Sequence, residues 1–213
     1  MPKQWIKEHQ KEHFYRSAKK EGYRARSAFK LIHINDKFKI FRRVYTLLDL
    51  GCAPGSWLQV SKEFIDANIQ KDKGKIAPKL LGVDIEKISP IEGVNFIQMD
   101  INDNSLESKI NGFFENEQID LIISDCSINK TGNKTLDQVS QIRICNRVVE
   151  IAIQFLKPDR FLVLKCFEGS ELASFIRNLK KKFQMVKKFI PGATRSRSSE
   201  LYLICKSIIK IKQ

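Results

Sequence analysis

The sequence predicts a doubly wound α/β fold around a mostly parallel, seven-stranded sheet, because short apolar runs alternate along the chain with longer amphipathic ones. The runs rich in Leu, Ile and Val are Tyr45–Leu50, Lys79–Val83, Val94–Gln98, Ile119–Ser124, Phe161–Lys165, Gln184–Phe189 and Leu201–Lys206. Strands separated by helices pair in parallel through right-handed crossovers. The chain has 213 residues, of which 42% are hydrophobic, so residues 1–213 are expected to form a single domain.

The elements follow in a clear order. Residues 1–40 are basic, have a helical pattern and precede the first strand, so we expect an N-terminal helical extension. The clearest helix is Thr135–Leu156, which has one apolar face and ends at Lys157-Pro158. Residues 69–78 read as a polar loop before the second strand. No helix separates the last two strands, which predicts an antiparallel strand at one edge of the sheet.

The charge balance points to a polyanionic partner. The chain carries 38 Lys and Arg against 24 Asp and Glu, a net charge of +14, and its pI is about 9.6. Such a surplus attracts nucleic acid through counterion release, although a merely lysine-rich soluble surface is the simpler alternative. No apolar run approaches the roughly 18 residues that span a bilayer, so no membrane association is expected.

The cysteines and histidines predict neither a disulfide framework nor a metal site. Five cysteines and three histidines show no metal-ligand spacing, and no C-x-x-C pair occurs. The first residues lack the apolar core of a secretory signal. We therefore expect an intracellular protein with free thiols, in a mitochondrion or other organelle or in the cytoplasm or nucleolus.

The segment Leu47–Trp57, LLDLGCAPGSW, follows the first strand and opens a helix, which is where open α/β sheets bind ligands. Gly51 allows a tight turn, and Gly55 allows close approach of the backbone. The spacing is not G-x-G-x-x-G, so a nicotinamide dinucleotide, and with it a dehydrogenase, is disfavoured.

Acidic residues end the next two strands. Asp84 could accept from both ribose hydroxyls of an adenosine, and Asp100 could accept from the adenine amino group. A single aspartate at such a position often only caps a turn, but three successive strand ends that offer Gly, Asp and Asp predict an adenosine-type cofactor.

The ordered motifs of the chain resemble those of the FtsJ-type (RrmJ-type) ribose 2′-O-methyltransferases, above all the bacterial large-subunit and mitochondrial-type members. These motifs are YRARSAFKL, DLGCAPGSW, GVDIEKISPIEGVNFIQMD, ISDCS, VLKCFEG and SRSSELYLI. The resemblance implies a Rossmann-like fold, S-adenosylmethionine as cofactor and methylation of a ribose, with a uridine of large-subunit ribosomal RNA as the expected target. It implies a catalytic tetrad of Lys30, Asp125, Lys165 and Glu200, and cofactor contacts at Gly51, Gly55, Ser56, Trp57, Asp84, Asp100 and Asp125.

The chemistry of ribose methylation is consistent with these residue types. The enzyme must align the oxygen, methyl carbon and sulfur and help a weakly acidic hydroxyl to lose its proton. A lysine amine acts as a base only when its pKa is depressed. Lys165 is the candidate base, Lys30 its like-charged neighbour, and Asp125 and Glu200 would orient the two amines. Each residue alone could equally be a solvated surface group.

One turn departs from the family pattern. After Asp125 the family usually reads Ala-Pro-Asn or Met-Ala-Pro-Asn, whereas this chain reads Cys126-Ser127-Ile128-Asn129. The loss of Ala-Pro removes a rigid turn beside the expected reaction centre. It is the one feature that favours a catalytically inactive ribosome-assembly factor on the same scaffold.

Basic residues near the predicted site are candidates for RNA contact. Cations hold phosphates and aromatic side chains stack on unpaired bases, and the N-terminal extension offers both. The specific candidates are Arg24, Arg26, Arg195 and Arg197. We expect a monomer that acts on ribosomal RNA, a ribosomal subunit or its precursor; transfer RNA and the messenger RNA cap are the alternative substrates.

Overall fold

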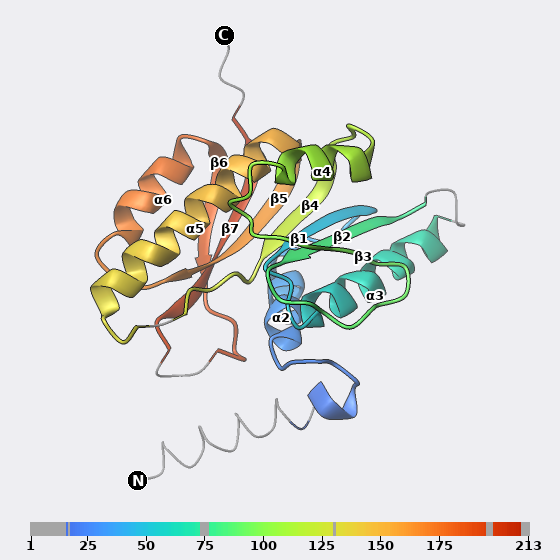
Figure 1. Cartoon of the computed structure of the whole chain (residues 1–213), viewed down its shortest axis with the longest axis horizontal. Helices are drawn as coiled ribbons and strands as arrows, with labels where there is room; N and C mark the ends of the chain where they lie inside the picture. Colours follow the sequence, from blue (N-terminus) through green and yellow to red (C-terminus); the bar gives the residue numbers. More distant parts are fainter. Residues whose placement is uncertain (1–15, 17, 73–76, 130, 195–197, 210–213) are drawn as a thin grey trace.

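The structure is a computed structural model that describes residues 16, 18–72, 77–129, 131–194 and 198–209 (Figure 1). Arg195, Arg197 and residues 1–15 and 17 of the predicted N-terminal extension lie outside these residues. The sheet has seven strands in the order β3-β2-β1-β4-β5-β7-β6. Their bounds are β1 Thr46–Leu50, β2 Lys79–Asp84, β3 Asn95–Gln98, β4 Ile119–Ser124, β5 Leu156–Phe167, β6 Phe183–Phe189 and β7 Glu200–Ile208.

Strand pairing confirms the predicted topology. Strands β1 to β5 pair in parallel, whereas β7 is antiparallel to both β5 and β6. The reversed strand therefore lies one position inside the edge, which β6 forms. Strand β5 is longer than predicted, because Leu156 already pairs with Ile119 across an irregularity in the β4–β5 register.

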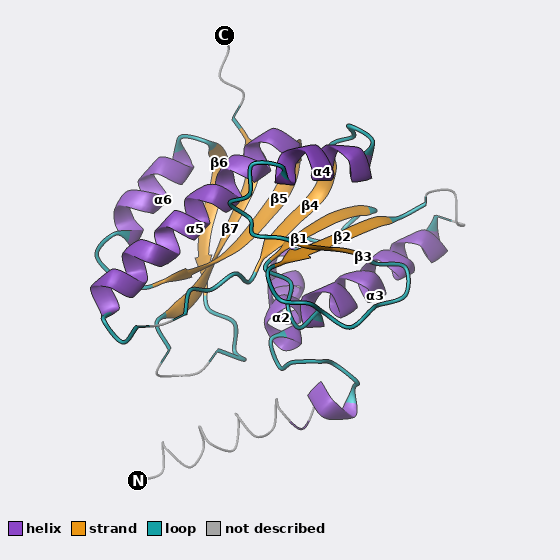
Figure 2. Ribbon diagram, viewed as in Figure 1, coloured by secondary structure: helices purple, strands orange, loops and turns teal. Residues whose placement is uncertain are grey.

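Helices cover both faces of the sheet (Figure 2). Their bounds are α2 Ala28–Phe38, α3 Ser56–Lys71, α4 Leu106–Phe114, α5 Lys134–Phe155 and α6 Leu172–Lys180. Helix α5 begins where Asn133 Oδ1 accepts from the backbone N–H groups of Thr135 and Leu136 at 3.1 and 3.2 Å. Helix α3 extends to Lys71, so the polar loop predicted from residue 69 begins too early.

Alternate residues of the central strands face two different cores. Leu47 and Leu121 point toward α2 and α3, whereas Leu48 and Ile122 point toward α4, α5 and α6. Because both faces are covered, all residues of β1 and β4 are buried. This packing brings the carboxyl ends of β1, β2, β4 and β5 to one edge of the sheet.

Neither a membrane-spanning helix nor a cluster of metal-ligand side chains occurs in the part of the chain that the structure describes. Within these ranges no helix is long and apolar enough to cross a membrane. The same part of the chain holds no cluster of three or more His, Cys, Asp or Glu side chains with metal-binding geometry.

Candidate active site

The loop after β1 packs tightly against the loop after β4. Gly51 and Gly55 have φ angles of +77° and +104°, a backbone region that favours glycine. A Cβ atom on Gly51 would lie 2.2 Å from the Cys126 Sγ atom. Glycine is therefore required at position 51 both by conformation and by the close approach of Cys126.

A cavity of about 460 Å³ opens at these strand ends. Its walls come from the last residue of β2 and the segments that follow β1, β2, β3 and β4, together with one residue each from α5 and β5. They include Gly51, Ala53, Asp84, Ile85, Glu86, Asp100, Asn102, Asp125, Cys126, Ser127 and Lys165. The volume lies in the range of small-ligand and cofactor sites.

Two carboxylates on the cavity wall are held rigidly by the backbone. Asp84 accepts at 2.8 Å from the N–H of Ala53 through Oδ2 and at 2.8 Å from the N–H of Glu86 through Oδ1. Asp100 Oδ1 accepts from the backbone N–H and side-chain amide of Asn102 at 2.8 and 2.9 Å. A carboxylate oxygen can accept more than one hydrogen bond, so both groups can also accept from the hydroxyl and amino groups of an adenosine.

The cavity is acidic although the chain is strongly basic. Asp84, Glu86, Asp100 and Asp125 line it, and Lys165 is its one cationic residue among those described. Such a wall attracts a cationic ligand rather than a polyphosphate.

Asp49 adds a buried carboxyl to this acidic region. It is fully buried, and neither side-chain oxygen has a hydrogen-bond partner among the described residues. Burial, together with the charges of Asp125 and Asp84, raises the pKa of Asp49 well above its usual value. Asp49 is not among the residues that line the cavity, so the carboxylates of the wall, and not Asp49, would attract the sulfonium and ammonium groups of a ligand such as S-adenosylmethionine.

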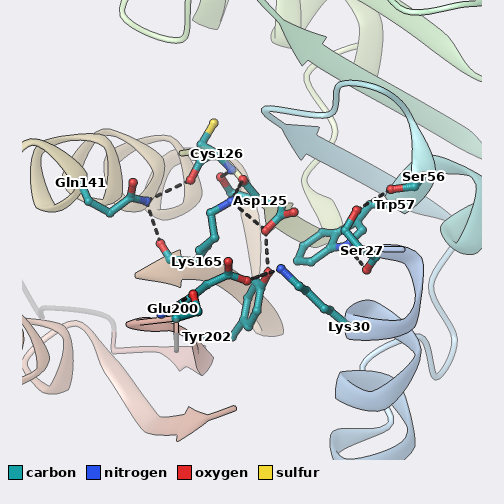
Figure 3. Close-up of polar contacts among 12 residues, drawn as sticks. Ser27, Lys30, Ser56, Trp57, Asp125, Cys126, Gln141, Lys165, Glu200 and Tyr202 are labelled. Carbon is teal, nitrogen blue, oxygen red and sulfur yellow. Dashed lines mark hydrogen bonds and ion pairs between the residues drawn. The ribbon is translucent and has the colours of Figure 1, made fainter. Parts of the chain in front are cut away.

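The structure brings the four predicted catalytic residues together from four elements (Figure 3). Lys165 Nζ lies 3.1 Å from Asp125 Oδ1 and also donates to the backbone carbonyl of Asp125. Lys30 forms an ion pair with Glu200. Lys30 and Lys165 are each only 8% exposed, so water screens these two ion pairs weakly.

Tyr202 joins the two ion pairs, and sequence reasoning missed it as a site residue. Its hydroxyl oxygen lies 2.6 Å from Asp125 Oδ1 and 3.0 Å from Glu200 Oε1 (Figure 3). The single phenolic hydrogen of Tyr202 is thus shared between the carboxylates of Asp125 and Glu200. Burial and the charges of Asp125 and Glu200 raise the pKa of Tyr202 well above its usual value, so the phenol stays neutral. The available signal was its place two residues after Glu200, on the same face of β7.

Glu200 is ionised despite its burial. Burial alone would raise its pKa, but the charge and hydrogen bond of Lys30, the charge of Lys165 and the Tyr202 hydroxyl outweigh that effect. The pKa of Glu200 therefore lies below its usual value, and the tetrad holds an ionised Glu200 at neutral pH.

Gly55, Ser56 and Trp57 were predicted to contact the cofactor, but they are not among the residues that line the cavity. Trp57 is buried, donates from Nε1 to the Ser27 carbonyl at 2.8 Å and packs against the Tyr202 ring at 5.6 Å between centroids. The Ser27 and Ser56 hydroxyl oxygens lie 2.8 Å apart. These contacts fix the start of α2 and thereby Lys30; direct contact of the three residues with the cofactor stays a prediction.

Arg24, predicted to contact RNA, is engaged within the protein. Its guanidinium donates to the backbone carbonyls of Pro54, Ser89 and Pro90 at 3.1, 2.7 and 2.8 Å. It thus ties the segment before α2 to the loop after β1 and to the loop between β2 and β3. RNA contact by Arg24 and Arg26 stays a prediction, and Arg195 and Arg197 lie outside the described residues.

Fold and site together define an S-adenosylmethionine-dependent methyltransferase. A solved ribosomal RNA methyltransferase from Plasmodium falciparum superposes with a TM-score of 0.75 at 29% identity, over 89% of this chain and all of that one. Human methyltransferase-like protein 13, solved in complex with SAH, shares the fold, with a TM-score of 0.50 and 14% identity over 87% of this chain and 82% of that one.

Sequence comparison identifies the family. Residues 23–208 match the model of the FtsJ-like methyltransferases. "Ribosomal RNA large subunit methyltransferase E" of Chromobacterium violaceum is 37% identical over 95% of this chain and 94% of its own length. The protein of the same name from Methanothrix thermoacetophila is 39% identical over 94% of this chain and 74% of its own length. The chain belongs to the FtsJ-like methyltransferase family, which confirms the resemblance noted in its motifs.

Proposed function

We propose that this protein transfers the methyl group of S-adenosylmethionine to the 2′-hydroxyl of a ribose in large-subunit ribosomal RNA. The observation that carries the proposal is the arrangement of two buried lysine–carboxylate pairs, bridged by the Tyr202 hydroxyl, at the side of an acidic cavity. The names of the relatives from Chromobacterium and Methanothrix support ribosomal RNA as the substrate.

S-adenosylmethionine supplies an activated methyl group, so the chain itself must orient the accepting hydroxyl and take up its proton. Lys165 lines the cavity, whereas Lys30 is not among its lining residues. Two of the three N–H bonds of Lys165 are directed to the Oδ1 and carbonyl oxygens of Asp125. The third position of the amine is left for the ribose oxygen, as a donor when protonated and as a base when neutral.

Lys30 would position the substrate, whereas Lys165 would take up the proton. Lys30 pairs with Glu200, and its Nζ atom lies 5.8 Å from the centroid of the Tyr202 ring. These contacts hold Lys30 beside the Lys165–Asp125 pair, whose carboxylate it does not share. Its amine would help to orient the ribose beside Lys165. Burial of both amines excludes water that would otherwise compete for the hydroxyl.

Replacement of Lys165 by Ala tests the proposal. Methyl transfer from labelled S-adenosylmethionine to large-subunit RNA should fall at least about 100-fold, the usual contribution of a proton-transfer group. The Kd for S-adenosylmethionine, measured by calorimetry, should stay within about twofold, which is a change of about 0.4 kcal/mol in binding free energy. Lys181→Ala, at an exposed position after α6, is the matched control and should behave like the unmodified protein.

The substrate is tested with free RNA and assembled subunits in parallel, and the product is mapped by resistance of the methylated position to alkaline cleavage. Normal turnover by Lys165→Ala contradicts the mechanism. Methylation of transfer RNA or a cap structure in place of ribosomal RNA contradicts the substrate. RNA binding without any transfer by the unmodified protein would identify an assembly factor instead of an enzyme.

A further inference from the structure

Gln141 lies in α5, fully buried, and connects the two backbone segments that carry Asp125 and Lys165 (Figure 3). Its Nε2 atom donates to the carbonyl of Cys126 at 2.9 Å and to the carbonyl of Lys165 at 3.1 Å. Its Oε1 atom accepts from the backbone N–H of Ile128 at 3.2 Å. A primary amide has two N–H donors and a carbonyl oxygen with two lone pairs, so these three contacts use both donors and one lone pair; Nε2 also lies 3.9 Å from Cys145 Sγ within α5.

The unusual turn after β4 explains why such a side chain is needed. Where the family usually has Ala-Pro, this chain has Ser127 and Ile128. Proline has no backbone N–H and a fixed φ, whereas Ile128 brings a donor that needs an acceptor and a φ that must be held from outside. Gln141 supplies that acceptor and also binds the carbonyl at the start of the same turn.

We propose that Gln141 is a positioning residue that sets the geometry of Asp125 and Lys165 in place of a proline-containing turn. This inference rests on the proposed function of the site. Gln141 is absent from the residues that line the cavity, so it acts through the backbone and not on the substrate. Its contacts fall on Lys165 itself and on Cys126, the neighbour of Asp125, so a shift of either segment changes the 3.1 Å distance from Lys165 Nζ to Asp125 Oδ1.

The test compares Gln141→Met, which keeps the length of the side chain and removes the three hydrogen bonds to the backbone of Cys126, Ile128 and Lys165, with the unmodified protein. The kcat for methyl transfer should fall between about 10-fold and 100-fold, because small displacements of reacting groups have effects of this size. The KM for RNA and the affinity for S-adenosylmethionine should change less than about twofold. Gln154→Leu, an exposed position on the same helix, is the control and should leave kcat unchanged.

Two further measurements separate positioning from a merely structural role. In the Gln141→Met background, Ile128→Pro removes the unsatisfied N–H and stiffens the turn, and it should restore part of the lost kcat. A crystal structure of Gln141→Met should show the Lys165–Asp125 pair opened beyond about 4 Å, the limit for an ion pair. This second readout does not depend on activity, so it stands even if the unmodified protein fails to methylate ribosomal RNA.

The proposal is overturned if Gln141→Met keeps its kcat within about twofold, or if the ion pair stays closed in its structure. It is likewise overturned if kcat falls only together with the unfolding midpoint and the affinity for S-adenosylmethionine, without rescue by Ile128→Pro. Gln141→Glu, which retains only the acceptor for Ile128, replaces Gln141→Met should that variant fail to fold. If neither variant folds, the role of Gln141 is structural and the proposal fails.

Discussion

Asp49 should lower the free energy of unfolding as pH rises, and the substitution Asp49→Asn should remove this dependence. Its carboxyl is fully buried without a partner among the described residues, and burial raises its pKa well above the ordinary value of 3.8. The folded state therefore binds this proton more tightly than the unfolded state. For a group with a raised pKa, the stabilisation is fully present below the unfolded pKa and is lost as pH rises toward the folded pKa.

The size of the loss follows from the linkage of proton binding and folding. Between the two pKa values, the free energy of unfolding falls by about 1.4 kcal/mol per pH unit because of this one group. Asparagine cannot ionise, so Asp49→Asn should gain stability relative to the unmodified protein by the same slope as pH rises above about 5. A constant offset of about 1–3 kcal/mol for the unpaired amide is expected, and it does not change with pH.

Urea unfolding at a series of pH values between about 5 and 7.5 measures this slope. Asp36→Asn, at an exposed position of α2, is the matched control and should show no such divergence. A difference between Asp49→Asn and the unmodified protein that is flat with pH would refute the reasoning. It would mean that Asp49 ionises in the folded state as easily as in the unfolded chain.

Two further substitutions test contacts around the tetrad. Tyr202→Phe removes the hydroxyl shared by Asp125 and Glu200, so the free energy of unfolding should fall by about 1.5–3 kcal/mol and methyl transfer should fall with it. Tyr23→Phe, whose hydroxyl donates to the exposed Glu63, is the control and should lose less than about 1 kcal/mol; equal losses would contradict the bridging role. Arg24→Gln removes the guanidinium contacts with three backbone carbonyls beside the cofactor loop, so the Kd for S-adenosylmethionine should rise about 10-fold, or 1.4 kcal/mol by calorimetry. If RNA affinity alone falls in Arg24→Gln, Arg24 contacts RNA, as the sequence predicts.

The strand pattern predicted the fold because the central strands are buried on both faces. Residues 119–124 were predicted as a strand and form β4 with the same bounds. The beginning of β5 was missed because Leu156 continues the helical period of α5 and Pro158 indicates a helix end. Pairing of Leu156 with Ile119, a contact between distant parts of the chain, decides its structure instead.

The predicted tetrad depended on motif order, since no local period links Lys30 with Glu200 across 170 positions. The residues that hold the tetrad in place could not be predicted in this way. Gln141 has the appearance of a polar position on an amphipathic helix, and its three partners come from the segments after β4 and in β5. A buried hydrogen-bonding side chain is recognised only when its partners are known.

The whole chain and its cavity have charges of opposite sign, and each charge favours a different kind of partner. A net charge of +14 predicts an attraction to RNA, yet most of the charged residues that line the cavity are carboxylates. The two fit together because the carboxylates lie at the ends of parallel strands, where the sheet gathers residues far apart in sequence, while Lys30 and Lys165 are neutralised by their partners within the tetrad. A basic chain can thus attract RNA while its acidic cavity favours a cationic cofactor, and the Lys165–Asp125 pair lies in the wall of that cavity.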